Sequence, residues 1–169
     1  MRRLVVLAVL ATDAAGSAGA GPTTPLRLHG IGPLQLGMTR TAALAPGWLA
    51  GRGRGCPLGG PPVPITYGFT GPRAPAGLKG FAEFDGGRLR VMSFTAGVHT
   101  AAGVTVGQTT SARMVSRYRS SGFSARARFD HTFGGTFVSV TRGTDQLIGA
   151  FATNGAISEL AIPDVPVCE

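Results

Sequence analysis

Two pairs of arginines have the spacing best suited to binding chemistry in this 169-residue chain. Arg126 and Arg128 alternate in a predicted strand, so both guanidinium groups should lie on one face of a sheet. Arg88 and Arg90 have the same spacing in an earlier predicted strand. Guanidinium groups held side by side bind carboxylates or phosphates bidentately. If the two faces converge, the four arginines form a cationic stripe. The alternative is four scattered, solvated side chains.

Further contact residues are expected around a segment rich in Gly, Pro and Arg, residues 50–64. Arg52 and Arg54 lie in this segment, which we expect to be an exposed loop available for contact. Trp48 and Tyr67 flank the loop and can serve as aromatic anchors if they are exposed, as can Phe94 and Phe151. These residues favour a binding protein.

No pattern in the sequence indicates catalysis or metal binding. The three histidines, His29, His99 and His131, lack the spacing of a metal site. Asp130 and His131 could form half of a catalytic triad, but no Gly-x-Ser-x-Gly motif supplies the nucleophile. We therefore expect neither an enzyme nor a cofactor.

The charge of the chain limits its partners. The formal net charge is +8, and nearly all of the basic side chains are arginines. Such a surface attracts acidic polysaccharide, anionic membrane or nucleic acid. The arginine excess is equally expected from a GC-rich genome. Few aromatic residues are interleaved with the basic ones, and the predicted export also argues against nucleic acid.

Residues 1–20 have the pattern of a secretory signal peptide. Arg2 and Arg3 precede an apolar run from Leu4 to Ala11, and Ala18-Gly19-Ala20 provides a small-residue cleavage site. The apolar run is too short for a membrane-spanning helix. The alternative is a buried N-terminal strand or helix. We expect cleavage near Ala20 and a mature protein in the extracellular or envelope space.

The two cysteines are Cys56 and Cys168. In an exported protein an even pair most often forms a disulfide. A metal site would need more ligands than two distant thiols. We therefore predict a structural bridge that joins the glycine-rich segment to the C-terminal end.

Two similar segments position these residues. Residues 34–39 and 104–109 each read as a short strand, a glycine and a threonine that can cap a helix, and the glycines are 107 − 37 = 70 positions apart. The first predicted helix is short, and the second runs to about residue 121. A hairpin is predicted around Asp85-Gly86-Gly87, with strands at residues 80–84 and 88–95. Four consecutive strands follow at residues 123–129, 136–142, 146–153 and 156–162.

Runs of strands after a helix predict an α+β fold with antiparallel sheets. We expect two similar helix-plus-antiparallel-sheet repeats, at about residues 26–98 and 99–169, that form one small secreted domain over residues 21–169. Leu89, Val91 and Ser93 should share one sheet face. We expect one face of the sheets to pack on the helices and the other to be partly covered or used for binding. A monomer is expected.

The tandem units resemble a family of exported bacterial proteins. The Leu-Gly-Met-Thr unit at residues 36–39, its echo at residues 106–110 (Val-Gly-Gln-Thr-Thr) and the Gly-turned strands look like the beta-lactamase-inhibitor-protein and BamE-type group. The opening from Gly30 to Thr39 and the Cys-Glu ending are similar to small secreted proteins of high-GC bacteria. The resemblance implies a sheet face used for protein binding. The inhibitors have a disulfide inside each repeat, and BamE-type proteins carry a lipobox cysteine. This sequence has neither feature.

The sequence thus predicts a non-enzymatic module that recognises an extracellular or envelope protein through an open sheet face and the Gly/Arg-rich loop. The alternative is a cationic binder of acidic envelope polymers or of an anionic membrane surface.

Overall fold

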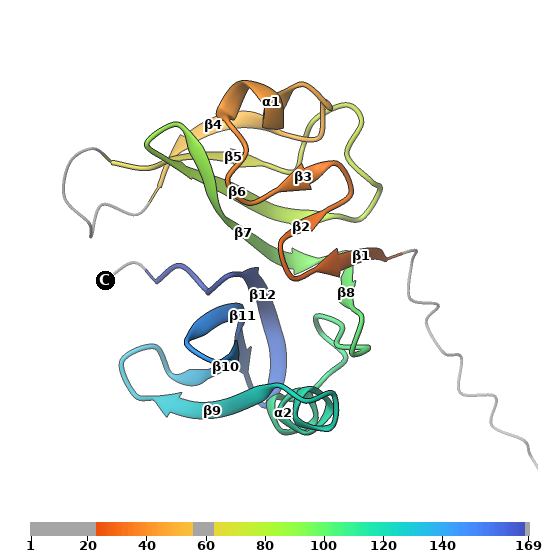
Figure 1. Ribbon diagram of the computed structural model, residues 1–169, viewed down its shortest axis with the longest axis vertical. Coiled ribbons are helices and arrows are strands. Elements are labelled where there is room, and N and C mark those ends of the chain that lie inside the picture. Colours follow the sequence, from red (N-terminus) through yellow and green to blue (C-terminus); the bar gives the residue numbers. More distant parts are fainter. Residues whose placement is uncertain (1–22, 56–62, 168–169) are drawn as a thin grey trace, which may run out of the picture.

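The structure is a computed structural model that describes residues 23–55 and 63–167 (Figure 1). Strands account for 51% of the described residues, and two helices account for 11%. The described chain is therefore mainly β. The prediction of an α+β fold built from two helix-plus-sheet repeats was wrong.

One antiparallel sheet of eight strands dominates the molecule. Its strands, in spatial order, are β4 (Ala50–Arg54), β5 (Ile65–Gly68), β6 (Lys79–Asp85), β7 (Arg88–Ala96), β12 (Ala156–Ile162), β11 (Asp145–Thr153), β10 (Gly135–Arg142) and β9 (Ser124–Asp130). The two halves of the chain meet where β7 pairs with β12.

A second sheet has four short strands. Their spatial order is β3 (Leu34–Gln35), β2 (Gly30–Ile31), β1 (Thr24–Arg27) and β8 (Val98–Thr100). The β1–β8 pair is parallel and aligns Thr24 with Val98. This pair ties the start of the described chain to the segment that links its two halves.

Glycine turns define the long strands. Gly86 and Gly87 have φ angles of +55° and +75°, as the tight β6–β7 hairpin requires. Asn154 and Gly155 have φ angles of +52° and +80° between β11 and β12. The predicted hairpin and the four predicted strands of the second half are confirmed, with ends that differ by a few residues.

Threonine caps begin both helices, α1 (Arg40–Leu44) and α2 (Ser111–Ser120). The Thr39 hydroxyl accepts a hydrogen bond from the Ala42 N–H at 3.3 Å, and the Thr110 hydroxyl accepts one from the Arg113 N–H at 3.2 Å. The predicted cap at Thr39 is therefore confirmed, and of the two threonines that could start the second helix, Thr109 and Thr110, the cap is Thr110. Neither helix of the described chain combines the length and the hydrophobicity needed to cross a bilayer.

The two Gly–Thr segments dock on the sheet by similar backbone contacts. The Gly37 N–H donates to the Leu89 carbonyl at 2.8 Å, and the Gly107 N–H donates to the Ile157 carbonyl at 2.7 Å. The elements around them differ, because α1 has five residues and α2 has ten. Pro46 follows closely after α1 and prevents its extension. The helices alone do not form the layer expected of two α+β repeats, because the small sheet makes up part of it.

The segment predicted as a loop at residues 50–64 begins with a strand. Arg52 and Arg54 lie on β4, where Arg52 is opposite Tyr67 and Arg54 is opposite Ile65 on β5. A bulge precedes Arg52, at Gly51, whose φ is +66°. The loop prediction was therefore wrong for residues 50–54, and residues 56–62, including Cys56, lie outside the described chain.

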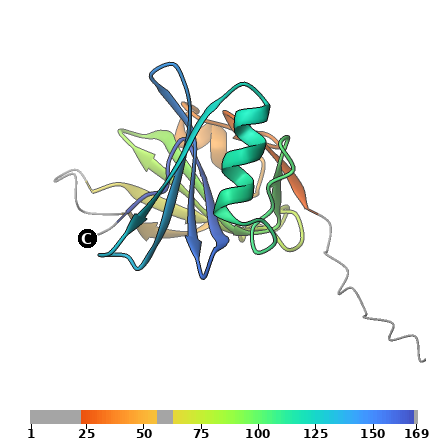
Figure 2. The same cartoon turned by 90° about the horizontal axis from the view of Figure 1, so that it is seen from below.

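The core lies between one face of the large sheet and a layer made by the small sheet and the two helices (Figures 1 and 2). Leu160 is opposite Phe94, and Ile162 is opposite Met92, across the β7–β12 pair. All four side chains are fully buried. This pair is the centre of the core.

We predict that Leu160→Ala lowers the free energy of unfolding by about 2–5 kcal/mol, because it leaves a cavity in a packed core. Phe129→Ala is the matched control, since Phe129 is 55% exposed and should cost less than about 1 kcal/mol. Urea denaturation of both variants measures the difference. Equal losses would contradict the central position of Leu160.

Candidate binding face

The large sheet has one face that the helices do not cover, here called the open face. Strand registers assign side chains to it, because residues opposite each other share a face. Val138 and Ala150 point into the core, so their neighbours Phe137 and Phe151 point the other way. Between β7 and β9 the open face includes Ser93, Arg126, Arg128, Phe137, Ser139, Gly149, Phe151, Glu159 and Ala161.

Three phenylalanines form a cluster on this face, here called the phenylalanine cluster. The Phe137 ring lies 4.8 Å from that of Phe151, and the Phe133 ring contacts Phe137 edge-on at 5.6 Å. All three side chains are only half-buried. Aromatic rings in this state keep apolar area that a partner can cover.

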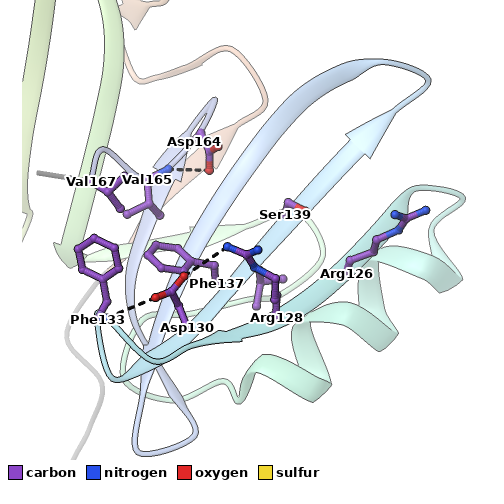
Figure 3. Close-up of a pocket in the computed structure, with 10 residues that line it drawn as sticks. Arg126, Arg128, Asp130, Phe133, Phe137, Ser139, Asp164, Val165 and Val167 are labelled. Carbon is purple, nitrogen blue, oxygen red and sulfur yellow. Dashed lines mark hydrogen bonds and ion pairs between the residues drawn. The ribbon is translucent and has the colours of Figure 1, made fainter. Parts of the chain in front are cut away.

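The C-terminal segment, residues 163–167, lies across the open face. Gly149 is beneath it, and a Cβ at that position would overlap the Asp164 carboxylate. On one side of the segment is a cavity of about 440 Å³ lined by Arg126, Arg128 and Ser139 (Figure 3). A cavity of about 220 Å³ adjoins Phe151 and Glu159. The phenylalanine cluster borders both cavities through Phe133 and Phe137.

Arg126 and Arg128 lie side by side on β9, as predicted, and both line the larger cavity. The Arg128 guanidinium pairs with the Asp130 carboxylate at 3.3 Å, and its side chain is 82% exposed. Asp130 also accepts a hydrogen bond from the Thr132 N–H at 2.9 Å, which fixes the turn after β9. Arg126 points away from this pair (Figure 3) and forms no ion pair within the described residues.

The other predicted arginines lie elsewhere. Arg88 donates to the Gly37 carbonyl at 2.9 Å. Its strand, β7, is separated from β9 by β12, β11 and β10. Arg52 and Arg54 lie on β4 at the opposite edge of the sheet. The structure therefore does not gather the predicted arginines into one cationic stripe.

A β-bulge changes the predicted faces of β7. Glu83 is opposite Val91, but the next residue of β6, Phe84, is opposite Leu89, so Arg90 is an extra residue. Leu89 consequently joins the buried face with Phe84. The prediction that Leu89 shares a face with Val91 and Ser93 was wrong.

The predicted aromatic anchors pack mainly into the protein. Trp48 is half-buried, and its ring occupies the space where a side chain at Gly32 would lie. Tyr67 contacts Phe84 edge-on at 5.7 Å on the core side of the sheet. Phe94 is fully buried. Of the four candidates, Phe151 alone belongs to the open face.

Sequence reasoning missed Phe133 and Phe137. The signal for Phe137 was present, because residues 137–140 alternate between Phe or Ser and Val. Val138 and Val140 satisfy the core, which leaves Phe137 on the opposite face. Phe133 gives no such signal, since it lies in the turn between β9 and β10.

Two carboxyl groups lie beside the cavities: Glu159 is half-buried, and Asp164 is exposed but partly shielded from solvent by its neighbours. Burial raises the pKa of Glu159, and the hydrogen bond donated by the Ser93 hydroxyl opposes this shift. Burial also raises the pKa of Asp164, opposed by the Val165 N–H, which donates to its carboxylate at 2.9 Å. The open face thus holds negative charge at an electrostatic cost.

No protein family matches the chain, and neither a curated protein nor a solved structure shows significant similarity to it. Within residues 23–55 and 63–167, no three His, Cys, Asp or Glu side chains lie close enough to hold a metal ion. The predicted signal peptide and the predicted Cys56–Cys168 bridge fall outside the described residues.

We predict that Glu159→Gln stabilises the protein at neutral pH. The raised pKa means that the folded state binds a proton more tightly than the unfolded state, so stability due to Glu159 falls as pH rises. The neutral amide removes this cost, and its carbonyl still accepts from Ser93. Urea midpoints of the two proteins should differ at pH 7 and converge below the usual carboxyl pKa of 4.5. A constant difference across this range would contradict the prediction.

Proposed function

We propose that this chain is a non-enzymatic binding module that recognises another protein through the open face of its large sheet. The observation that carries the proposal is the half-buried phenylalanine cluster beside Arg126 and Arg128, on a face that no helix of the described chain covers. Aromatic residues and arginines are the side chains most enriched at the energetic centres of protein interfaces.

The arrangement suits a protein partner for a physical reason. The rings of Phe137 and Phe151 are held by strand backbone and by contact with each other, so little conformational entropy is lost when a partner covers them. Arg126 is an exposed donor at the border of the same surface, where it can meet a carboxylate. An apolar centre with a polar rim is the usual composition of such an interface.

The alternative, a cationic binder of acidic envelope polymers or of an anionic membrane, has less support. Such binding needs many basic side chains on one surface. Here the arginine pairs at β4 and β9 lie at opposite edges of an eight-stranded sheet. We therefore favour protein recognition.

We predict that the mature protein retains a stoichiometric protein partner from the producer's secretome or envelope fraction after a high-salt wash. Apolar contacts survive added salt, whereas binding by exposed arginines alone weakens as ions screen it. Phe137→Ala combined with Phe151→Ala should abolish capture. Arg126→Ala combined with Arg128→Ala should mainly slow association.

Arg90→Ala is the matched control, since Arg90 is exposed, lines neither cavity and lies on β7, which three strands separate from β9. It should capture the partner as the parent protein does. Circular dichroism verifies that each variant is folded. Complete elution by salt, with acidic polymer in the eluate, would overturn the proposal in favour of the cationic binder.

We also propose that the protein is exported, with cleavage near Ala20, and that Cys56 and Cys168 form a disulfide in the mature chain. The support is the sequence pattern of residues 1–20 and the single pair of cysteines. N-terminal sequencing of the secreted protein should begin at Gly21, and a non-reducing peptide map should contain the linked peptides. Free thiols in the exported protein would contradict the bridge.

A further inference from the structure

Strand β9 forms a free edge of the large sheet. It is last in the strand order, and among the described residues no strand pairs with its outer side. Ala125 is its one buried residue, and five of the other six, Ser124 and residues 126–129, are exposed. Figure 1 shows β9 at the lower end of the molecule, next to α2. A free edge presents unpaired backbone donors and acceptors.

One hydrogen bond identifies which backbone groups point outward. The Arg119 guanidinium Nε–H donates to the Ala125 carbonyl at 2.9 Å, so that carbonyl is directed away from β10. In an antiparallel pair, outward and inward residues alternate along the strand. The N–H and C=O groups of Ala127 and Phe129 therefore also point to the free edge.

The side chains of β9 differ between its two faces. Arg126 and Arg128 lie on the open face, where both line the larger cavity. Phe129 lies on the opposite face and is 55% exposed, the most exposed large apolar residue of the described chain. Its ring contacts His131 at 5.0 Å. The edge thus combines two cations on one side with an apolar ring on the other.

We propose that β9 binds an extended acidic segment of another protein by antiparallel strand addition. In this register the partner residue facing Ala127 exchanges backbone hydrogen bonds with it. The residues on either side of it face Arg126 and Arg128 in non-hydrogen-bonded pairs, where side chains are closest. Read from its N-terminal side, the matching partner segment has an apolar residue opposite Phe129 and an acidic residue opposite Arg128. Any residue can then lie opposite Ala127, and a second acidic residue lies opposite Arg126.

Charge complementarity distinguishes this partner from a second copy of the chain. Two β9 strands paired antiparallel about Ala127 would place Arg126 opposite Arg128 of the other copy, twice. Like charges directly opposite each other destabilise a strand pair. Carboxylates at the same positions can accept hydrogen bonds from both guanidinium groups. Asp130 pairs with the Nη2 atom of Arg128, which leaves the other nitrogens of that guanidinium available to a partner. The arginines therefore select an acidic strand and oppose self-pairing.

The test measures binding of a short labelled peptide in which Val and Glu alternate, by fluorescence anisotropy on the full mature protein. Ala127→Pro removes one outward N–H, and proline is tolerated at edge positions whose N–H faces solvent. We expect this variant to weaken binding at least about tenfold, with an unchanged thermal melting temperature. Ala127→Ser is the matched control and should bind like the parent.

Two further measurements separate strand addition from simple charge attraction. The peptide N-methylated at the valine that faces Ala127 should lose binding to the parent protein, which keeps the test decisive even if Ala127→Pro fails to fold. Arg126→Glu combined with Arg128→Glu should reverse the preference toward a Val–Lys peptide. Equal binding of the methylated and unmethylated peptides, or no binding of the Val–Glu peptide, would overturn the inference.

The inference stands apart from recognition by the open face. Ala127→Pro leaves the phenylalanine cluster intact, so a partner that binds the open face is still captured by this variant. Replacement of Phe137 and Phe151 has the reverse effect, because it leaves the outward groups of β9 in place.

Discussion

The antiparallel pairing of β7 with β12 is the interaction on which the rest of the structure depends. It joins strands that are distant in sequence, since Phe94 and Leu160 are opposite each other and 160 − 94 = 66 positions apart. Their side chains, with those of Met92 and Ile162, are fully buried and connect the apolar residues of both halves. Without this pair, each half would be a four-stranded sheet with an exposed edge and an uncovered core.

The same pairing determines what the two faces can do. The small sheet and both helices cover one face, and that face holds most of the buried apolar side chains. The C-terminal segment lies on the other face, where Phe137, Phe151 and Glu159 stay half-buried. Continuous strands fix their positions laterally, which gives the open face the rigidity that specific recognition requires.

Local signals in the sequence predicted the elements better than their assembly. Gly86-Gly87 and Asn154-Gly155 mark their turns, because few other residues adopt positive φ without strain. Thr39 and Thr110 mark the helix starts by their capping hydroxyls. The fold class was mispredicted because nothing local shows that the long strands of both halves join in one eight-stranded sheet, or that β1, β2, β3 and β8 form a separate sheet.

The candidate site was only partly predictable, for a geometric reason. Alternation along β9 correctly places Arg126 and Arg128 on one face. Alternation along one strand says nothing about the order of the strands across the sheet. The separation of β9 from β7 and β4 could therefore not be predicted from it. An extra residue at Arg90 shifts the alternation and moves Leu89 to the core. A bulge of this kind leaves no clear composition signal.

The parallel β1–β8 pair has a consequence for the order of assembly. The hairpins of the large sheet join strands that are consecutive in sequence, and a β-hairpin forms in about 1–10 μs. Thr24 pairs with Val98, so the first strand waits for a segment 98 − 24 = 74 residues later. Contacts with such separation slow folding, because the intervening loop must close before the contact contributes. The small sheet thus reaches its full four-strand order only when the central segment is available, although β1 can pair locally with β2 before then.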